Sequence, residues 1–154
     1  MDGIGAGMLP VVAEVRAGGF ARPVRGVKVF SRQLLGGCGP TFGGVELDFE
    51  PVPVGEVSSC TFACTALPEP DAELEEALVQ GVLRELSGDD TNSPEEARRG
   101  VVGARVIVRA LLWHPVDSCK RVFVRLGALA VREAVQCVAE DREPQEIITR
   151  VSLL

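Results

Sequence analysis

Residues 43–52 read Gly-Gly-Val-Glu-Leu-Asp-Phe-Glu-Pro-Val and show the clearest alternation in the chain. The apolar side chains Val45, Leu47 and Phe49 alternate with acidic ones, so they point to one face of an extended segment. The pattern predicts a strand with one buried face and one wet face. A strand of this kind needs other elements to cover its apolar side, and the rest of the chain contains them.

Strands are also predicted over residues 9–16, 24–32, 56–66, 101–113 and 147–153. A helix is predicted over about 71–87, because Leu74, Leu78, Val82 and Leu86 recur every four residues between Asp71 as N-cap and Gly88 as terminator. A second helix is predicted over about 118–139. Asp117 is expected to cap it, and its apolar stripe is Phe123, Leu126, Ala130, Ala134 and Cys137.

This order of elements predicts the α+β class: a single two-layer domain over residues 1–154, in which two helices cover one face of a mixed sheet. Residues 24–32 are expected to form an exposed edge strand, and residues 1–8 a flexible N-terminus. Composition agrees with one globular domain, since 46% of the 154 residues are hydrophobic and 25% are charged. No apolar run is long enough to span a bilayer, and the N-terminus lacks the basic start of a secretory signal, so we expect a cytoplasmic protein.

Charge is distributed unevenly around a formal net charge of -6. Residues 1–44 carry five basic and two acidic side chains, residues 45–100 carry three and fourteen, and residues 101–154 carry eight and six. The overall acidity argues against DNA binding or general nucleic-acid binding, because contacts to phosphate need cations. It leaves room for a local basic surface built from the two flanking segments.

Cysteine and histidine content limits the chemistry. The five cysteines are an odd number and are expected to be reduced. Cys60 and Cys64 are explained by positions i and i+4 of one strand face, so we expect no metal site. His114, Asp117 and Cys119 are residue types that can serve as a base, an orienting acid and a nucleophile. They lie too close together in sequence for a usual catalytic set. With no P-loop in the sequence, we expect no enzyme activity and no cofactor.

Three stretches together resemble a known family. They are Gly-Gly-Cys-Gly-Pro-Thr-Phe-Gly-Gly-Val at residues 36–45, leading to Phe-Glu-Pro-Val-Pro at 49–53, then Leu-Val-Gln-Gly-Val at 78–82, and Leu-Trp-His-Pro-Val-Asp-Ser-Cys-Lys at 112–120. They resemble the fourth domain of elongation factor G and its relatives, elongation factor 2 and the tetracycline-resistance ribosomal protection proteins. The His-Pro-Val-Asp-Ser run is the most specific of the three. The resemblance covers about residues 24–140.

The resemblance implies a compact α+β domain with a left-handed βαβ crossover, whose tip enters the decoding region of the small ribosomal subunit. His114 would be the tip histidine, and Gly36, Gly37 and Gly39 would shape the loop beside it. Pro115 departs from the family pattern, which usually has an acidic or polar residue there. Further departures are Cys119, the acidic loop at residues 88–100, and the lack of a GTPase domain in this chain.

The remaining candidate site residues each have two interpretations. Arg32, Lys120 and Arg121 would meet near one end if the two loops are adjacent, which suits phosphate recognition, or they are ordinary solvated cations. Trp113 is either a stacking platform for a base or a residue packed at the sheet end. His114 either contacts RNA or ends a strand by chance. Ser118 is interpreted as a first-turn position of the last helix.

The sequence therefore predicts a non-catalytic, translation-factor-like module that contacts small-subunit ribosomal RNA through its tip. One alternative is a protein-interaction or scaffold domain that keeps the fold and has lost the ribosome. Another is one subunit of a split translation factor, with its GTPase on a separate chain. No membrane partner is expected. The charge at the loop end discriminates between these hypotheses, because a positive end favours RNA and a negative or apolar end favours a protein.

Overall fold

A computed structural model describes residues 20–32, 42–53, 56–67, 69, 71–88, 103–115 and 118–149, with only the backbone described for 64–67. Several predictions lie outside these residues: the strand at 9–16, the flexible N-terminus at 1–8, the loop with Gly36, Gly37 and Gly39, Asp117, and the acidic loop beyond residue 88. The part of the predicted last strand beyond Thr149 also lies outside.

The described residues form β1 (Val24–Ser31), β2 (Gly43–Glu50), β3 (Ser59–Leu67), α1 (Ala72–Ser87), β4 (Arg105–Leu112), α2 (Lys120–Glu140) and β5 (Ile147–Thr149). Each of these elements falls within or close to a segment where the sequence predicted it. The α+β class is confirmed, with one mixed sheet and two helices.

The sheet has the strand order β3-β4-β2-β1-β5. Neighbours β1 and β2, and β2 and β4, are antiparallel, whereas β3 and β4, and β1 and β5, are parallel. The prediction that residues 24–32 form an edge strand is wrong, because β1 lies between β2 and β5. Residues 147–149 return beside Val29, Phe30 and Ser31 and cover the end of that strand.

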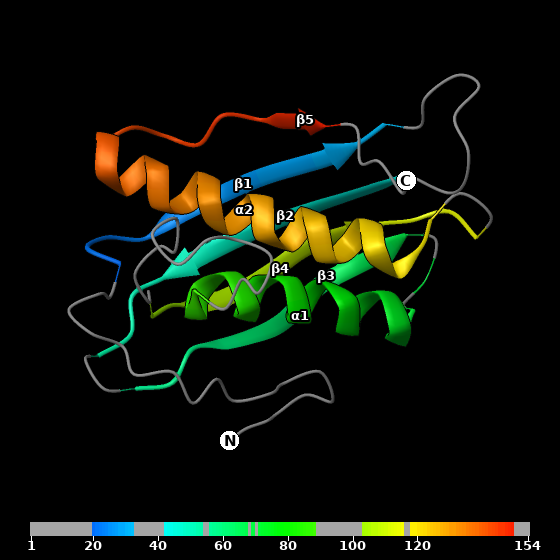
Figure 1. The fold of residues 1–154 in the computed structure, drawn as a ribbon, viewed down its shortest axis with the longest axis horizontal. Coiled ribbons are helices and arrows are strands. Elements are labelled where there is room, and N and C mark those ends of the chain that lie inside the picture. The colour runs from blue at the N-terminus through cyan, green and yellow to red at the C-terminus, as the bar shows by residue number, and fades with distance from the viewer. Residues whose placement is uncertain are drawn as a thin grey trace.

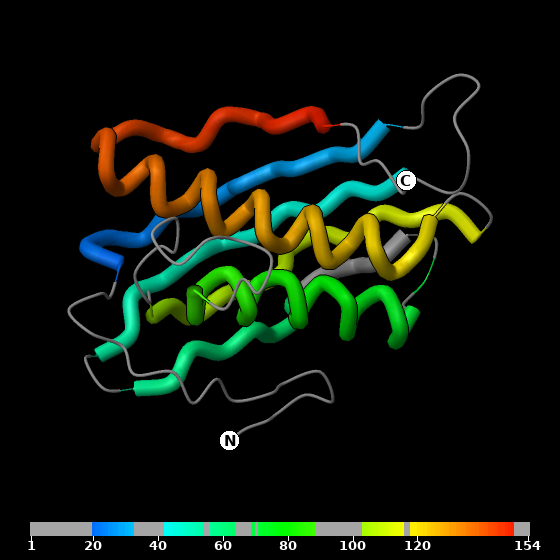
Figure 2. Tube along the Cα trace, viewed as in Figure 1, coloured from blue at the N-terminus to red at the C-terminus, as the bar shows by residue number. Residues whose placement is uncertain are grey.

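Both helices lie on one face of the sheet (Figures 1 and 2), with α2 against β1 and β2 and α1 against β3. In Figure 1 the parallel strands β3 and β4 run to the right, β4 lies above β3, and the connecting helix α1 lies in front of them. A β-α-β connection with this geometry is left-handed. The crossover therefore has the hand that the resemblance implied, which is the rare one for parallel strands. Neither helix in the described part of the chain has the length and apolar character to cross a bilayer.

The core lies between the sheet and the helices. Val45, Leu47 and Phe49 of the central strand β2 are each at most 1% exposed, as the alternation predicted. The predicted apolar stripes of both helices are buried against them; these are Leu74, Leu78, Val82 and Leu86 of α1, and Phe123, Leu126, Ala130, Ala134 and Cys137 of α2. Asp71 caps α1 by accepting a hydrogen bond from the Leu74 N–H at 3.0 Å.

Asp48 differs from its neighbours on the wet face of β2, because it is only 6% exposed. Its carboxylate accepts hydrogen bonds from the Gly26 N–H at 2.9 Å and from Nε of Arg109 at 2.8 Å. Irregularities in strand register occur at Gly26, where φ is +76°, and beside Arg109. The Asp48 carboxylate thus accepts a hydrogen bond from the backbone at one β-bulge and forms an ion pair with the side chain at the other.

A third irregularity lies in β3, where the pairing with β4 shifts between Phe62 and Thr65. The side chain at position 64 lies outside the described part of the chain, so the prediction that Cys60 and Cys64 share a strand face stays a prediction.

The two helices approach each other at glycines. A Cβ atom on Gly81 of α1 would lie 2.1 Å from the carbonyl oxygen of Val124, and one on Gly127 of α2 would lie 2.8 Å from that of Leu78. Only residues without a side chain allow the backbones to come so close. Further along, Nε of Arg132 in α2 donates a hydrogen bond to the carboxylate of Glu85 in α1 at 3.0 Å. The glycine in the 78–82 stretch is therefore a packing residue.

Glu133 fixes the connection from α2 to β5. Its carboxylate accepts two hydrogen bonds from the Arg142 guanidinium, at 2.7 and 3.2 Å, and one from the Gln145 N–H at 2.9 Å. These contacts hold the segment that returns to pair with β1.

Candidate nucleic-acid interface

Several elements begin or end together at one end of the sheet, which we call the tip end. Strand β1 ends there at Ser31, opposite Gly43 where β2 begins, and Gly44 pairs with Leu112 where β4 ends. Both helices begin at this end, on the right of Figure 1. The tip end thus brings together residues from four widely separated parts of the chain.

A turn over residues 114–118 joins β4 to α2, and Ser118 closes it. The His114 N–H donates to the Ser118 hydroxyl at 2.9 Å, and the Ser118 N–H donates to the His114 carbonyl at 3.0 Å. The Ser118 hydroxyl in turn donates to the carbonyl oxygen of Phe42 at 2.7 Å. This turn is therefore bound to the residue that leads into β2.

Phe42 is the first described residue after the loop that contains Gly36, Gly37 and Gly39. The structure binds Ser118, the last residue of the His-Pro-Val-Asp-Ser run, to Phe42. That the two loops are neighbours stays a prediction. Gly36, Gly37 and Gly39 themselves lie outside the described residues. Sequence reasoning missed the bridge because Ser118 carries only the pattern of a first-turn residue.

The beginning of α2 is basic. Lys120 and Arg121 are exposed, as is His114 in the turn before them. The first turn of α2 holds no acidic residue, and the side chain at its N-cap makes no capping hydrogen bond. Because a helix N-terminus carries partial positive charge, the cations and the helix dipole together favour an anion at this place.

The N-cap of α2 is Cys119, not Asp117. The helix begins at Lys120, two residues later than predicted, and Asp117 lies outside the described residues. The early start was predicted because aspartate is a strong capping residue. In the structure, Ser118, the residue before the cap, is instead bonded to His114 and Phe42.

The beginning of α1 gives the same end an acidic part. Asp71 caps this helix, and Glu73 and Glu75 lie in its first turn. Burial and the nearby charge of Asp71 raise the pKa of Glu75 above its usual value. The tip end is therefore divided, with positive charge at the start of α2 and negative charge at the start of α1.

Trp113 lies between these two parts. Its ring packs against the core, and its indole N–H donates to the carbonyl oxygen of Glu69 at 2.5 Å. The side chain ties the end of β4 to the segment between β3 and α1. This contact favours the packing interpretation of Trp113 over the stacking one.

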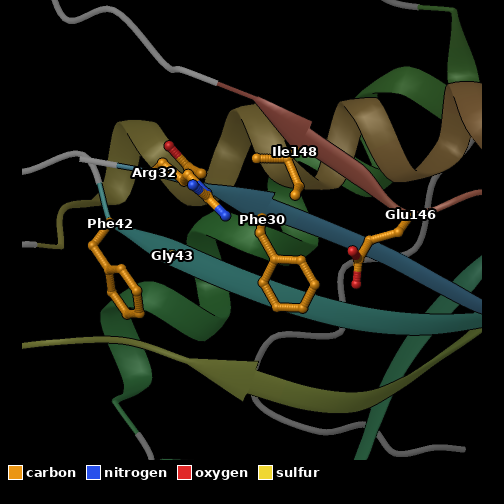
Figure 3. A pocket seen from close by; sticks show the side chains of 7 residues that line it. Phe30, Arg32, Phe42, Gly43, Glu146 and Ile148 are labelled. Atoms are coloured by element: carbon orange, nitrogen blue, oxygen red, sulfur yellow. The ribbon is translucent and has the colours of Figure 1, made fainter. Parts of the chain in front are cut away.

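Arg32 does not lie in the helix layer with Lys120 and Arg121. Its backbone N–H donates to the Thr149 carbonyl at 3.0 Å, which continues the pairing of β1 with β5. Its side chain is exposed and lines a hollow on the sheet face away from the helices (Figure 3). The predicted group of three cations is thus split across the two faces of the sheet.

The hollow was not predicted from the sequence. It has a volume of about 430 Å³ and is lined by Phe30, Ser31, Arg32, Phe42, Gly43, Glu146 and Ile148. Figure 3 shows its side chains in front of the sheet, with the helices behind. Alternation in β1 places Phe30 opposite the buried Val29, but nothing in the sequence indicates that Phe42 and Ile148 join it.

The described cysteines do not add reactive chemistry in the core. Cys60, Cys119 and Cys137 are reduced thiols. Burial raises the pKa of Cys60 to about 12. Burial, together with the neighbouring Glu133, raises the pKa of Cys137 to about 11, so both buried thiols stay protonated at neutral pH. Within the described ranges, no three His, Cys, Asp or Glu side chains are grouped so as to hold a metal ion.

No family model matches the chain, and no curated protein matches it. Among solved structures, the chain is similar to ttk003000868 from Thermus thermophilus, with 23% sequence identity and a TM-score of 0.48 over 71% of this chain. The match spans 16% of the length of that protein.

Proposed function

We propose that this chain is a non-catalytic, translation-factor-like module that contacts small-subunit ribosomal RNA in the decoding region through its tip end. The observation that carries the proposal is the Ser118 bridge to Phe42. It joins the last residue of the His-Pro-Val-Asp-Ser run to Phe42, which follows the glycine loop, and the resemblance assigns these two loops to the tip.

The charges at the start of α2 support a partner that carries phosphate groups, as RNA does. Lys120 and Arg121 are exposed cations next to an exposed His114, at the positive end of a helix. Cations of this kind make the phosphate contacts that position a protein on a nucleic acid. The acidic start of α1 on the same end would repel RNA and so restrict contact to the α2 side.

The test is sedimentation of the purified protein with ribosomes through a sucrose cushion at several salt concentrations. The double variant His114→Ala with Lys120→Ala is compared with the wild type. We expect salt-sensitive co-pelleting that the variant weakens, with a shallower salt dependence, because each lost phosphate contact lowers the slope of log affinity against log salt by about one.

The matched control is Arg105→Ala. Arg105 is an exposed cation at the start of β4, so it lies at the opposite end of the sheet from the tip end. This variant should pellet like the wild type. If the wild type fails to pellet at low salt, or if Arg105→Ala weakens pelleting as much as the tip variant, the proposal is wrong.

A second candidate function is protein interaction, either as a scaffold or as one subunit of a split translation factor with a separate GTPase chain. The observation that favours it is the acidic start of α1, with Asp71, Glu73 and Glu75, at the same end. A basic protein surface would recognise these carboxylates. Affinity capture in which Glu73→Lys loses a partner that wild type retains would support this candidate.

A further inference from the structure

The sheet face away from the helices holds an aromatic hollow next to the proposed interface. Phe42, Val57 and Ile148 are the large apolar side chains that are strongly exposed among the described residues, and two of them, Phe42 at 37% and Ile148 at 51%, line this one hollow. Exposed apolar groups that gather in one place mark a binding site more often than scattered ones do.

At the floor of the hollow, two glycines of β2 let side chains approach the strand backbone closely. A Cβ atom on Gly44 would lie 2.6 Å from the ring of Phe30, so the ring lies directly on the glycine backbone. On the other face of the sheet, a Cβ atom on Gly43 would lie 3.0 Å from side chains of α2. The two adjacent glycines therefore let the strand accept a ring on one side and a helix on the other.

The chemistry of the lining suits a nucleotide. Phe30 and Phe42 provide aromatic surface, and Ile148 adds an apolar wall (Figure 3). Arg32 is an exposed cation at the same hollow and suits a phosphate, while the carboxylate of Glu146 accepts hydrogen bonds from the edge of a base. Aromatic rings beside an arginine are the combination that binds single-stranded nucleic acid.

The hollow is also continuous with the tip end. Phe42 contributes its side chain to the hollow, and its carbonyl oxygen accepts the hydrogen bond from Ser118. An RNA strand that contacts Lys120 and Arg121 would meet the hollow as it passes over the edge of the sheet.

We propose that this hollow, formed by Phe30, Arg32, Phe42, Glu146 and Ile148, binds one unpaired base of a single-stranded RNA, stacked on Phe42. The inference rests on the proposed function, because the RNA is the one that the tip end contacts. It adds a second place of contact, on the sheet face away from the helices, that reads a base and not only phosphates.

The test uses an unstructured RNA oligomer of about eight nucleotides with 2-aminopurine at its centre, and a matched oligomer with an abasic site there. Stacking on an aromatic ring quenches the fluorescence of the base analogue. We expect wild type to quench it and to bind the first oligomer about tenfold more tightly than the abasic one.

Phe42→Leu removes the ring and keeps an apolar side chain at an exposed position. It should abolish both the quenching and the preference over the abasic oligomer. Val57→Ala, which removes exposed apolar surface outside the hollow, should leave both unchanged. Arg32→Ala should lower the salt slope by about one.

The outcomes separate this inference from the proposed function. Equal binding of both oligomers, weakened by Lys120→Ala and unaffected by Phe42→Leu, would overturn the base site and leave a phosphate contact at the tip end. Absence of oligomer binding at low salt would also overturn the base site, and ribosome pelleting then tests the proposed function by itself. Retention of an apolar peptide in place of RNA, lost in Phe42→Leu, would assign the hollow to a protein partner and overturn the inference.

Discussion

The Ser118 hydroxyl donates to the Phe42 carbonyl oxygen at 2.7 Å, across 76 positions of sequence. The same hydroxyl oxygen accepts the His114 N–H, so one side chain closes the turn and binds it to the start of β2. Both of its partners are backbone atoms, so the bridge depends on the hydroxyl of residue 118 and not on the identities of the other two side chains.

Ser118→Ala should therefore loosen the turn and lower the free energy of unfolding by about 1–2 kcal/mol, because two backbone groups lose their partner. Ser118→Thr retains the hydroxyl and should recover most of the loss. Urea denaturation measures both. Ser87→Ala is the control, since the Ser87 hydroxyl makes an exposed hydrogen bond to the Arg84 carbonyl within its own helix, and its effect should stay below about 0.5 kcal/mol.

Gly81→Ala should destabilise the protein by about 2–3 kcal/mol, because its Cβ would lie 2.1 Å from the Val124 carbonyl oxygen and the helices would have to separate. The gain of up to about 1 kcal/mol in helix propensity does not compensate. Gln80→Ala, at the neighbouring exposed position, should be nearly neutral. If Gly81→Ala proved stabilising in urea denaturation, the close approach of the helices would be refuted.

Asp48→Ala should cost about 2–3 kcal/mol of unfolding free energy, because the Gly26 N–H and the Arg109 guanidinium both lose a buried acceptor. Glu50→Ala is the matched control on the same strand. Glu50 pairs with Arg25, which is 61% exposed, and such surface pairs contribute at most about 1 kcal/mol. Equal losses for the two variants in chemical denaturation would contradict the structural role of Asp48.

Acid should weaken the Glu133 contacts that fix the segment after α2. Hydrogen bonds from Arg142, more than any other cause, keep the pKa of Glu133 below its usual value, against the raising effect of burial. A lowered pKa in the folded state means that this stabilisation is fully present above the unfolded pKa of about 4.3 and is lost as pH falls through the folded pKa.

Thermal melting of wild type and Glu133→Gln between about pH 7 and pH 2 measures this contribution. The wild type should be more stable at neutral pH, and the difference should shrink in acid. Glu143→Gln, at an exposed position nearby, should follow the wild-type profile. A difference between wild type and Glu133→Gln that stayed constant with pH would show that the carboxylate charge does not matter.

Most elements of the fold could be predicted, because each carries its own periodic pattern. The alternation around Leu47 and the four-residue spacing through Leu78 follow from which faces must be buried, and both were confirmed. Two of the details that were wrong share a common reason. The burial of Asp48 and the inner position of β1 depend on partners that come from other parts of the chain.

The candidate site could be predicted only where one stretch carries it. The His-Pro-Val-Asp-Ser motif drew attention to His114 and Lys120, and both residues are exposed at the tip end. The motif did not reveal what Ser118 binds. It also gave no sign of the hollow, because Phe30, Phe42 and Ile148 come from three separate segments.

The sequence by itself determined the α+β class, the buried faces and the extent of most elements, because burial periodicity is a local property of each segment. Only the tertiary structure decided how the tip end is assembled: that Ser118 binds Phe42, that Trp113 is tied to Glu69, and that Arg32 faces away from Lys120. These relationships depend on strand order and on the hand of the crossover. Many pairings satisfy the same periodic patterns, and the packing of both helices on one face selects among them.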